Sequence, residues 1–78
     1  MQHPVKLPRL GDTTRSVLVT EWLCAPGTDV EVGTPLMTVE TDKLTTDVVS
    51  PVSGRLVQHL VSVQDEVEVG APICVVEV

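Results

Sequence analysis

Aromatic residues are almost absent from this chain of 78 residues. It has no Phe and no Tyr, and Trp22 is its only tryptophan. Pockets that bind small molecules are lined mainly by hydrophobic and aromatic side chains, with a few polar groups that fix the orientation of the ligand. The composition therefore argues against an enzyme with a large aromatic-lined active site.

The residue patterns of metal sites and of nucleophilic catalysis are also missing. Cys24 and Cys74 form no C-x-x-C motif, and they do not combine with His3 and His59 at the spacing of a zinc site. No Ser–His–acid triad can be argued from the two histidines. We interpret the cysteines as small buried hydrophobic residues in a reducing compartment. We do not expect the chain to be an enzyme, and we expect no metal ligands.

Basic residues are few and do not cluster. Five Lys and Arg stand against eleven Asp and Glu, which gives a net charge of −6 and makes nucleic acid and anionic membranes poor partners. The N-terminal MQHPVKLP has no apolar targeting region, and no apolar run approaches transmembrane length. We expect a monomeric cytoplasmic chain, or a mitochondrial matrix protein if a transit peptide was removed. A basic protein partner would be attracted to this acidic surface.

Branched aliphatic residues make up much of the chain, with 17 Val, 8 Leu and 1 Ile. Valine favours strands over helices, and no segment has helical periodicity. Short strands separated by turn residues are typical of a sandwich or closed barrel. A chain of this length forms one domain, residues 1–78. The expected strands are Val5–Leu10 (with Pro8, on an edge), Val17–Cys24, Val30–Val32, Leu36–Thr41, Leu44–Val49, Arg55–Val63, Val67–Val69 and Ile73–Val78.

The chain contains an internal repeat of 37 residues. The segment VEVGTP at 30–35 aligns with VEVGAP at 67–72, and eight of the 22 positions of Val19–Glu40 are identical in Leu56–Glu77. Each half is too small to bury its strands alone. The repeat therefore predicts an all-β fold, a flattened barrel-sandwich of two antiparallel sheets with pseudo-two-fold symmetry.

The polar pair Asp42-Lys43 separates two of the expected strands. Asp is suited to turns, and neither flanking strand contains Gly or Pro, so the pattern predicts a β-hairpin with Lys43 at its tip. A shift of 37 residues places Lys43 on Lys6 in one direction and beyond Val78 in the other. The symmetry-related position of the hairpin is then the place where the termini meet. We expect the termini at one end of the domain and Lys43 at the other.

Nearly the whole chain resembles the lipoyl domains of 2-oxo acid dehydrogenase complexes. The resemblance lies in VKLPRLGDTTRSVLVTEW and in VEVGTPLMTVETDKLTTDVVSPVSG. Asp42 and Lys43 match the acidic residue and the modified lysine of that family, and Leu44 stands where a small or β-branched residue is usual. Glu40 matches an acidic residue implicated in recognition by the lipoylating enzyme. The resemblance implies lipoic acid bound covalently to Lys43, with Asp42, Leu44 and Glu40 recognised by that enzyme.

The resemblance also implies a carrier without catalytic activity of its own. Its lipoyl-lysine would be a swinging arm that transfers acyl groups between a thiamine-dependent 2-oxo acid decarboxylase, an acyltransferase core and dihydrolipoamide dehydrogenase. The chain would then be one domain of a dihydrolipoamide acyltransferase. In such domains the loop near Gly11 helps the decarboxylase to recognise its partner.

Two alternatives remain open. Biotinyl carrier domains of biotin-dependent carboxylases share the fold, but they place the lysine between two methionines, whereas Asp42 and Leu44 flank Lys43 here. An unmodified docking module would require the match at Lys43 to be accidental. The Glu-Gly-Asp turns common in the family are missing at 25–29 and 64–66, which affects the subfamily more than the function. The opening loop at 11–14 lacks the Gly-Glu-Gly variant common in several such domains, so the complex and the 2-oxo acid that it uses are left open.

Overall fold

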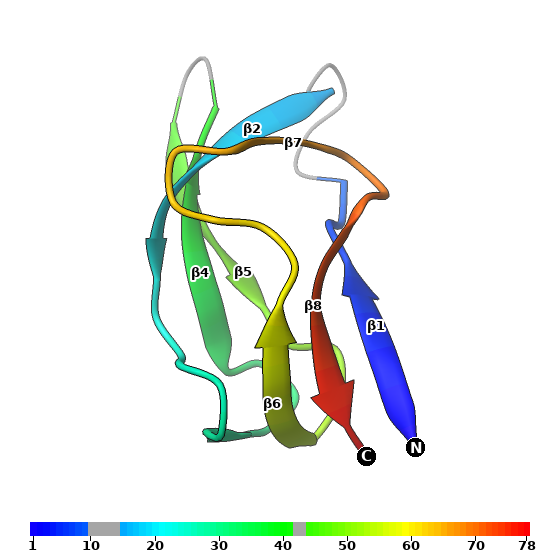
Figure 1. Cartoon of the computed structure of the whole chain (residues 1–78). Helices are drawn as coiled ribbons and strands as arrows, with labels where there is room; N and C mark the ends of the chain where they lie inside the picture. Colours follow the sequence, from blue (N-terminus) through cyan, green and yellow to red (C-terminus); the bar gives the residue numbers. More distant parts are fainter. Residues whose placement is uncertain (10–14, 42–43) are drawn as a thin grey trace.

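Two four-stranded antiparallel sheets form the two layers of the computed structural model (Figure 1). The structure describes residues 1–9, 15–41 and 44–78, and within these ranges it contains strands and no helix. The sheets have the strand orders β1-β8-β6-β3 and β5-β4-β2-β7. The predicted all-β sandwich is therefore confirmed. The strands are β1 (Gln2–Lys6), β2 (Ser16–Trp22), β3 (Asp29–Val30), β4 (Pro35–Glu40), β5 (Thr45–Val49), β6 (Gly54–His59), β7 (Glu66–Glu68) and β8 (Pro72–Glu77).

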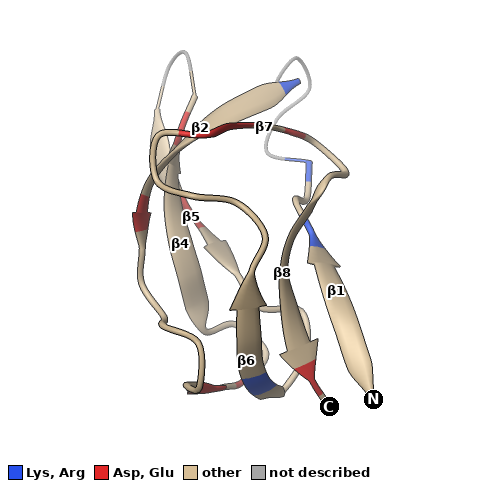
Figure 2. Cartoon of the chain, in the orientation of Figure 1, with Lys and Arg blue, Asp and Glu red and all other residues tan. Residues whose placement is uncertain are grey.

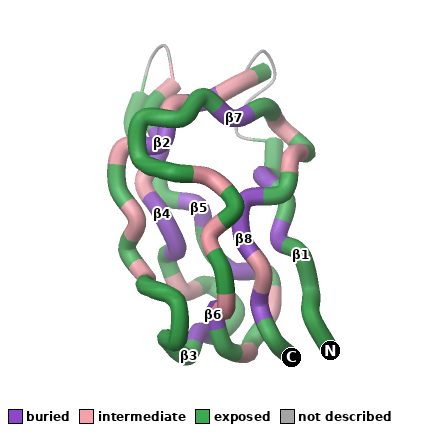
Figure 3. The backbone as a smooth tube through the Cα atoms, in the orientation of Figure 1, coloured by how far each residue is buried: buried purple, intermediate pink, exposed green. Residues whose placement is uncertain are grey.

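Most of the buried residues are branched aliphatic, and Figure 3 shows where the buried positions lie along the backbone. In β2, for example, Val17 and Val19 are buried, while the residues between and beside them are more exposed, as expected for a strand with one face on the core. Burying one such side chain contributes about 1.5–3 kcal/mol. The core therefore consists of small aliphatic groups: Val5, Leu7, Val17, Val19, Val30, Leu36, Met37, Val39, Val48, Leu56, Val67, Ile73, Cys74 and Val76.

The two halves are related by pseudo-two-fold symmetry, as the repeat predicted. Exchanging β4 with β8, β2 with β6, β3 with β7 and β1 with β5 converts one strand order into the other. β4 and β8 differ by 37 residues at both ends. The turns before them match as well, because Gly33 and Gly70 have φ values of 91° and 90°. Glycine adopts such positive φ without steric cost.

Trp22 and His59, which are 37 residues apart, stack on each other. Their ring centroids are 3.7 Å apart and the planes differ by 7°. Trp22 Nε1 donates to the carbonyl oxygen of Val61 at 3.0 Å, and His59 Nε2 donates to that of Cys24 at 2.8 Å. Because these two carbonyls are also 37 residues apart, the contact is reciprocal and joins the two halves. It gives His59 a structural partner and a fixed ring orientation.

The chain termini lie side by side, as predicted (Figure 1). The backbone N–H of Val78 donates to the carbonyl of Met1 at 2.8 Å. The expected equivalence of Lys6 and Lys43 is wrong, because β1 and β5 are related by 43 residues rather than 37. Lys6 pairs with Pro72 in the way that Val49 pairs with Pro35. The connection from β1 to β2 is longer than that from β5 to β6, and this changes the distance in sequence between equivalent residues from 37 to 43.

Four of the predicted strands differ from the structure by two residues or more at an end, and one of them is Val30–Val32, which is observed as Asp29–Val30. The first runs over Gln2–Lys6 instead of Val5–Leu10, although it is an edge strand as expected. The second ends at Trp22, and the strand predicted over Arg55–Val63 ends at His59. These positions again differ by 37 residues, so the repeat contained the signal for both ends.

A turn at Ser62–Asp65 follows the end of β6. The N–H of Asp65 donates to the carbonyl of Ser62 at 3.0 Å, and Gln64 between them has φ of 79°. The equivalent turn in the first half places Gly27, with φ of 96°, at the same position. Glutamine rarely adopts this conformation, so the turn was predicted two residues late, at Gln64–Glu66.

The two cysteines are free thiols in different environments. Cys74 is buried in β8, whereas Cys24 is only partly buried and its Sγ donates to the carbonyl of Pro35 at 3.3 Å. The interpretation as a buried hydrophobic residue is confirmed for Cys74 and holds only in part for Cys24. Burial, and to a lesser degree the charge of Cys24, raises the pKa of the Cys74 thiol to about 11.

We therefore expect the two thiols to react at different rates. In the folded chain at pH 8, a disulfide reagent should modify Cys24, because only the thiolate is nucleophilic and Cys74 stays protonated and covered. Cys74 should react only after denaturation. The folded chain keeps the Cys74 thiol protonated at pH values above the pKa of the unfolded thiol. The free energy of unfolding therefore falls as the pH rises from about 9 to about 11. Equal rates for both thiols in the folded chain would contradict this assignment.

Candidate functional site

The residues on either side of the predicted lysine tip are tied together by hydrogen bonds. β4 and β5 pair antiparallel up to Glu40 and Thr45. Beyond this pair, the N–H of Thr41 donates to the carbonyl of Leu44 at 2.8 Å. The Thr41 hydroxyl donates to the same carbonyl at 3.1 Å and accepts from the N–H of Leu44 at 3.2 Å. The two residues between them, Asp42 and Lys43, lie outside the described residues.

Side-chain bonds also tie β4 to both neighbouring strands on the outer face of the sheet. The hydroxyl of Thr38 donates to Asp47 Oδ1 at 2.9 Å across the β4–β5 pair. The hydroxyl of Thr20 in β2 donates to the carbonyl of Thr38 at 3.1 Å. β4 lies inside the sheet between β2 and β5. The base of the hairpin is therefore held on both sides.

The structure brings the described members of the predicted site together at the end of the domain away from the termini (Figure 1). Glu40, the last residue of β4, is exposed, and Leu44 is 52% exposed. Sequence analysis missed Thr41, which closes the base of the hairpin. A hydroxyl residue that enters a turn can bond nearby backbone groups, and this was the available signal.

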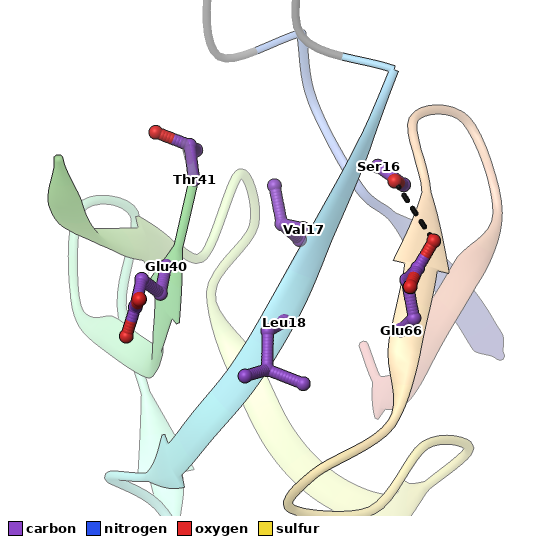
Figure 4. Close-up of a pocket in the computed structure, with 6 residues that line it drawn as sticks. All are labelled: Ser16, Val17, Leu18, Glu40, Thr41 and Glu66. Carbon is purple, nitrogen blue, oxygen red and sulfur yellow. Dashed lines mark hydrogen bonds between the residues drawn. The ribbon is translucent and has the colours of Figure 1, made fainter. Parts of the chain in front are cut away.

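An open groove of about 350 Å³ lies beside the base of the hairpin (Figure 4). Leu18 of β2 lies between Glu40 of β4 and Glu66 of β7, directly opposite both residues in the sheet. The hydroxyl of Ser16 donates to Glu66 Oε1 at 3.1 Å. Sequence analysis also missed Leu18 and Glu66. The groove lining is Ser16, Val17, Leu18, Glu40, Thr41 and Glu66.

Negative charge predominates at this end of the sheet. Figure 2 shows acidic residues along β7 and a basic residue near the start of β2. Among the described residues, no group of three or more His, Cys, Asp and Glu side chains could hold a metal ion. Nor does that part of the chain contain a helix long and apolar enough to span a membrane. The groove presents carboxylates to solvent, which suits contact with a positively charged surface.

Several known proteins are similar to this chain in sequence. The acetyltransferase component of the pyruvate dehydrogenase complex from Corynebacterium glutamicum is 45% identical over 88% of the chain and 10% of its own length. The succinyltransferase component of the 2-oxoglutarate dehydrogenase complex from Bartonella vinsonii subsp. berkhoffii is 36% identical over 99% of the chain and 19% of its own length. Both are named as dihydrolipoyllysine-residue acyltransferases. The chain thus spans a fifth or less of the length of these relatives.

Two solved structures share the fold. The lipoyl domain of the 2-oxoglutarate dehydrogenase complex from Azotobacter vinelandii superposes with a TM-score of 0.72 at 22% identity, over 95% of the chain and 94% of that domain. A single-chain long-chain acyl-CoA carboxylase superposes with a TM-score of 0.75 at 23% identity, over 95% of the chain and 7% of the carboxylase. The family model Biotin_lipoyl, described as "Biotin-requiring enzyme", matches residues 3–76. The chain therefore belongs to the Biotin_lipoyl family.

Proposed function

We propose that the chain is a lipoyl carrier domain of a dihydrolipoamide acyltransferase, with lipoic acid joined to Lys43 by an amide bond. The likeness to two dihydrolipoyllysine-residue acyltransferases, over 88% and 99% of the chain, is the observation that carries this proposal. Strands β4 and β5 support it, because they end in a closed pair on each side of Asp42-Lys43. The domain carries the acyl group and does not catalyse its transfer.

The described flanks of Lys43 fit an attached group. Glu40 and Leu44 are exposed, and the groove beside Thr41 is open to solvent. Lipoic acid supplies a disulfide that accepts an acyl group together with electrons, and this chemistry belongs to the cofactor. The chain itself supplies a fixed base, because a rigid hairpin loses little entropy when a partner docks. It also raises the effective concentration of the tethered group at each active site.

The partners follow from this role. They are the lipoylating enzyme, a thiamine-dependent 2-oxo acid decarboxylase, the acyltransferase core and dihydrolipoamide dehydrogenase. We assign Glu40, Asp42 and Leu44 to recognition by the lipoylating enzyme. The exposure of Glu40 and Leu44 beside the closed hairpin base supports this assignment.

A biotinyl carrier is the second candidate, since biotin and lipoyl domains form one family and a carboxylase shares the fold. The residues beside the lysine favour lipoate, because Asp42 and Leu44 stand where a biotinyl domain has methionines. The names of the two sequence relatives point in the same direction. An unmodified docking module would carry neither group.

Intact mass spectrometry tests the proposal directly. The chain should be produced in a host that has both lipoylating and biotinylating enzymes, with lipoate and biotin in the medium. We expect the mass to increase by one lipoyl group, and peptide mapping should locate it on Lys43. A biotinyl group at that position would establish the second candidate. An unmodified mass would refute the carrier role, and the unmodified docking module would then be the remaining candidate.

A further inference from the structure

Two carboxylates flank one leucine on the outer face of the sheet beside the lysine hairpin. Leu18 is directly opposite Glu40 on one side and Glu66 on the other. Its neighbours Val17 and Val19 are buried in the core, so Leu18 projects outward, and Figure 4 shows it between the two glutamates. Because the two glutamates are separated by two strand spacings, their backbones lie about 10 Å apart. We call these three residues the acidic row.

The pseudo-two-fold symmetry provides an internal comparison for this row. A shift of 37 residues converts Leu18 into Arg55, Glu40 into Glu77 and Glu66 into Asp29. Arg55 is directly opposite both Asp29 and Glu77 in the other sheet, so the geometry of the row is repeated. The central residue there is a cation between two carboxylates.

Both carboxylates of this symmetry-related row bind a cation. Arg55 Nε donates to Asp29 Oδ1 at 3.2 Å. Glu77 Oε1 accepts from the ammonium of Met1 at 2.9 Å. The same backbone arrangement therefore holds a guanidinium in one half of the molecule. In the other half the central position is apolar.

The acidic row has two carboxylates and no cation of its own. Within residues 1–9, 15–41 and 44–78, neither Glu40 nor Glu66 forms an ion pair. Ser16 holds one oxygen of Glu66, which leaves the other to a ligand. Arg15, at the start of β2, forms no ion pair with either glutamate. The row opens into the groove of about 350 Å³ beside the hairpin.

We propose that the acidic row receives an arginine side chain from the decarboxylase that acylates the domain. This rests on the proposed carrier function and adds the chemistry of one contact to it. A guanidinium carries five N–H donors in a plane, so it can bind two carboxylates at once while its face covers Leu18. The ammonium of a lysine is a compact point charge, so it would pair with one carboxylate and make little contact with the apolar side chain of Leu18. Arg55, which pairs with one of its two flanking carboxylates, Asp29, supplies a precedent within the same chain for one of these contacts.

Replacing one carboxylate of the acidic row tests whether the row is the receptor for the arginine of the decarboxylase. Glu66→Gln and its symmetry mate Asp29→Asn both reduce the net charge from −6 to −5. Both variants and the native chain should be lipoylated beforehand, so that recognition by the lipoylating enzyme does not enter the measurement. The enzyme to be assayed is whichever of the pyruvate, 2-oxoglutarate and branched-chain 2-oxo acid decarboxylases acylates the native chain fastest. We expect Glu66→Gln to raise KM about tenfold with kcat retained, and Asp29→Asn to leave both unchanged.

Placing a cation in the row provides a second test. Leu18→Arg copies the arrangement around Arg55, so its own guanidinium should pair with Glu66, as Arg55 pairs with Asp29, and exclude that of the partner. We expect a loss of decarboxylase affinity at least as large as that caused by Glu66→Gln. Leu18→Met keeps an apolar side chain at the same exposed position and should bind normally. A crystal structure of Leu18→Arg should show the guanidinium within about 4 Å of the Glu66 carboxylate.

The outcomes separate the two proposals. If none of these decarboxylases acylates the lipoylated native chain, the carrier function fails, and the proposed arginine contact fails with it. If the native chain is acylated and Glu66→Gln behaves like Asp29→Asn, the carrier function stands and the receptor is refuted. Equal affinities of Leu18→Arg and Leu18→Met would also refute the receptor. A selective loss in Glu66→Gln and Leu18→Arg supports it.

Discussion

Replacing Lys43 with glutamine is expected to abolish lipoylation and, with it, all reductive acylation of the chain. The amide to lipoic acid requires the lysine Nζ, and glutamine offers no nucleophilic amine at neutral pH. The fold should remain intact, because the fourteen residues that form the apolar core of the described part of the chain lie elsewhere. Substitutions away from such packing usually change stability by no more than about 0.5 kcal/mol. Intact mass, acylation by the decarboxylase and a thermal melt measure these three effects.

Lys6→Gln is the matched control, because it removes the same charge near the end of β1. It should be lipoylated and acylated like the native chain. Acylation of Lys43→Gln at a measurable rate would show that the lipoyl group is attached elsewhere. Unfolding of Lys43→Gln would show that the lysine has a structural role that its sequence position does not indicate.

Replacing Gly54 with alanine is expected to destabilise the domain by roughly 2–4 kcal/mol. A Cβ at this position would overlap the backbone carbonyl oxygen of Glu77 and would lie 2.8 Å from Cγ1 of Val76. Both atoms belong to β8, which is hydrogen-bonded to β6 and β1, so neither can move without disturbing two strand pairs. Since a domain of this size is only marginally stable, a loss of this magnitude removes much of its free energy of unfolding. Equilibrium denaturation in urea measures the change.

Gly33→Ala is the control for the loss of a glycine. Its Cβ would meet nothing within 4 Å, but its φ of 91° disfavours any side chain. We expect a cost of about 1 kcal/mol at this position, from backbone strain alone. A smaller effect at Gly54 than at Gly33 would contradict the close approach of β6 and β8.

Much of the fold could be predicted because the repeat carries long-range information. The match of 30–35 with 67–72 identifies two equivalent halves, and their valine content identifies strands. The structure confirms both inferences, and it pairs the termini as the symmetry required. Two of the failures occurred where the repeat is broken. Gln64 stands where the first half has Gly27, so the second turn was predicted too late, and the longer connection after β1 separates Lys6 from Lys43.

Only those residues of the candidate site that are neighbours in sequence could be predicted. Glu40, Asp42, Lys43 and Leu44 are neighbours in sequence, so a local motif can identify them. Glu66 reaches the same surface from β7, and this depends on a pairing of β2 and β7 that no local pattern specifies. Strand partners that are distant in sequence are set by the packing of the two sheets, and a single sequence does not display that packing.

The hydrogen bond between Val78 and Met1 has a consequence for engineering. It is the symmetry equivalent of the bond from the N–H of Thr41 to the carbonyl of Leu44. In the sequence, two residues connect Thr41 to Leu44. A dipeptide joining the two ends would therefore close the polypeptide into a ring without displacing any strand. A lysine in that dipeptide would be flanked by the same strand pairing as Lys43, the proposed acceptor, so one cyclic domain would offer two attachment points.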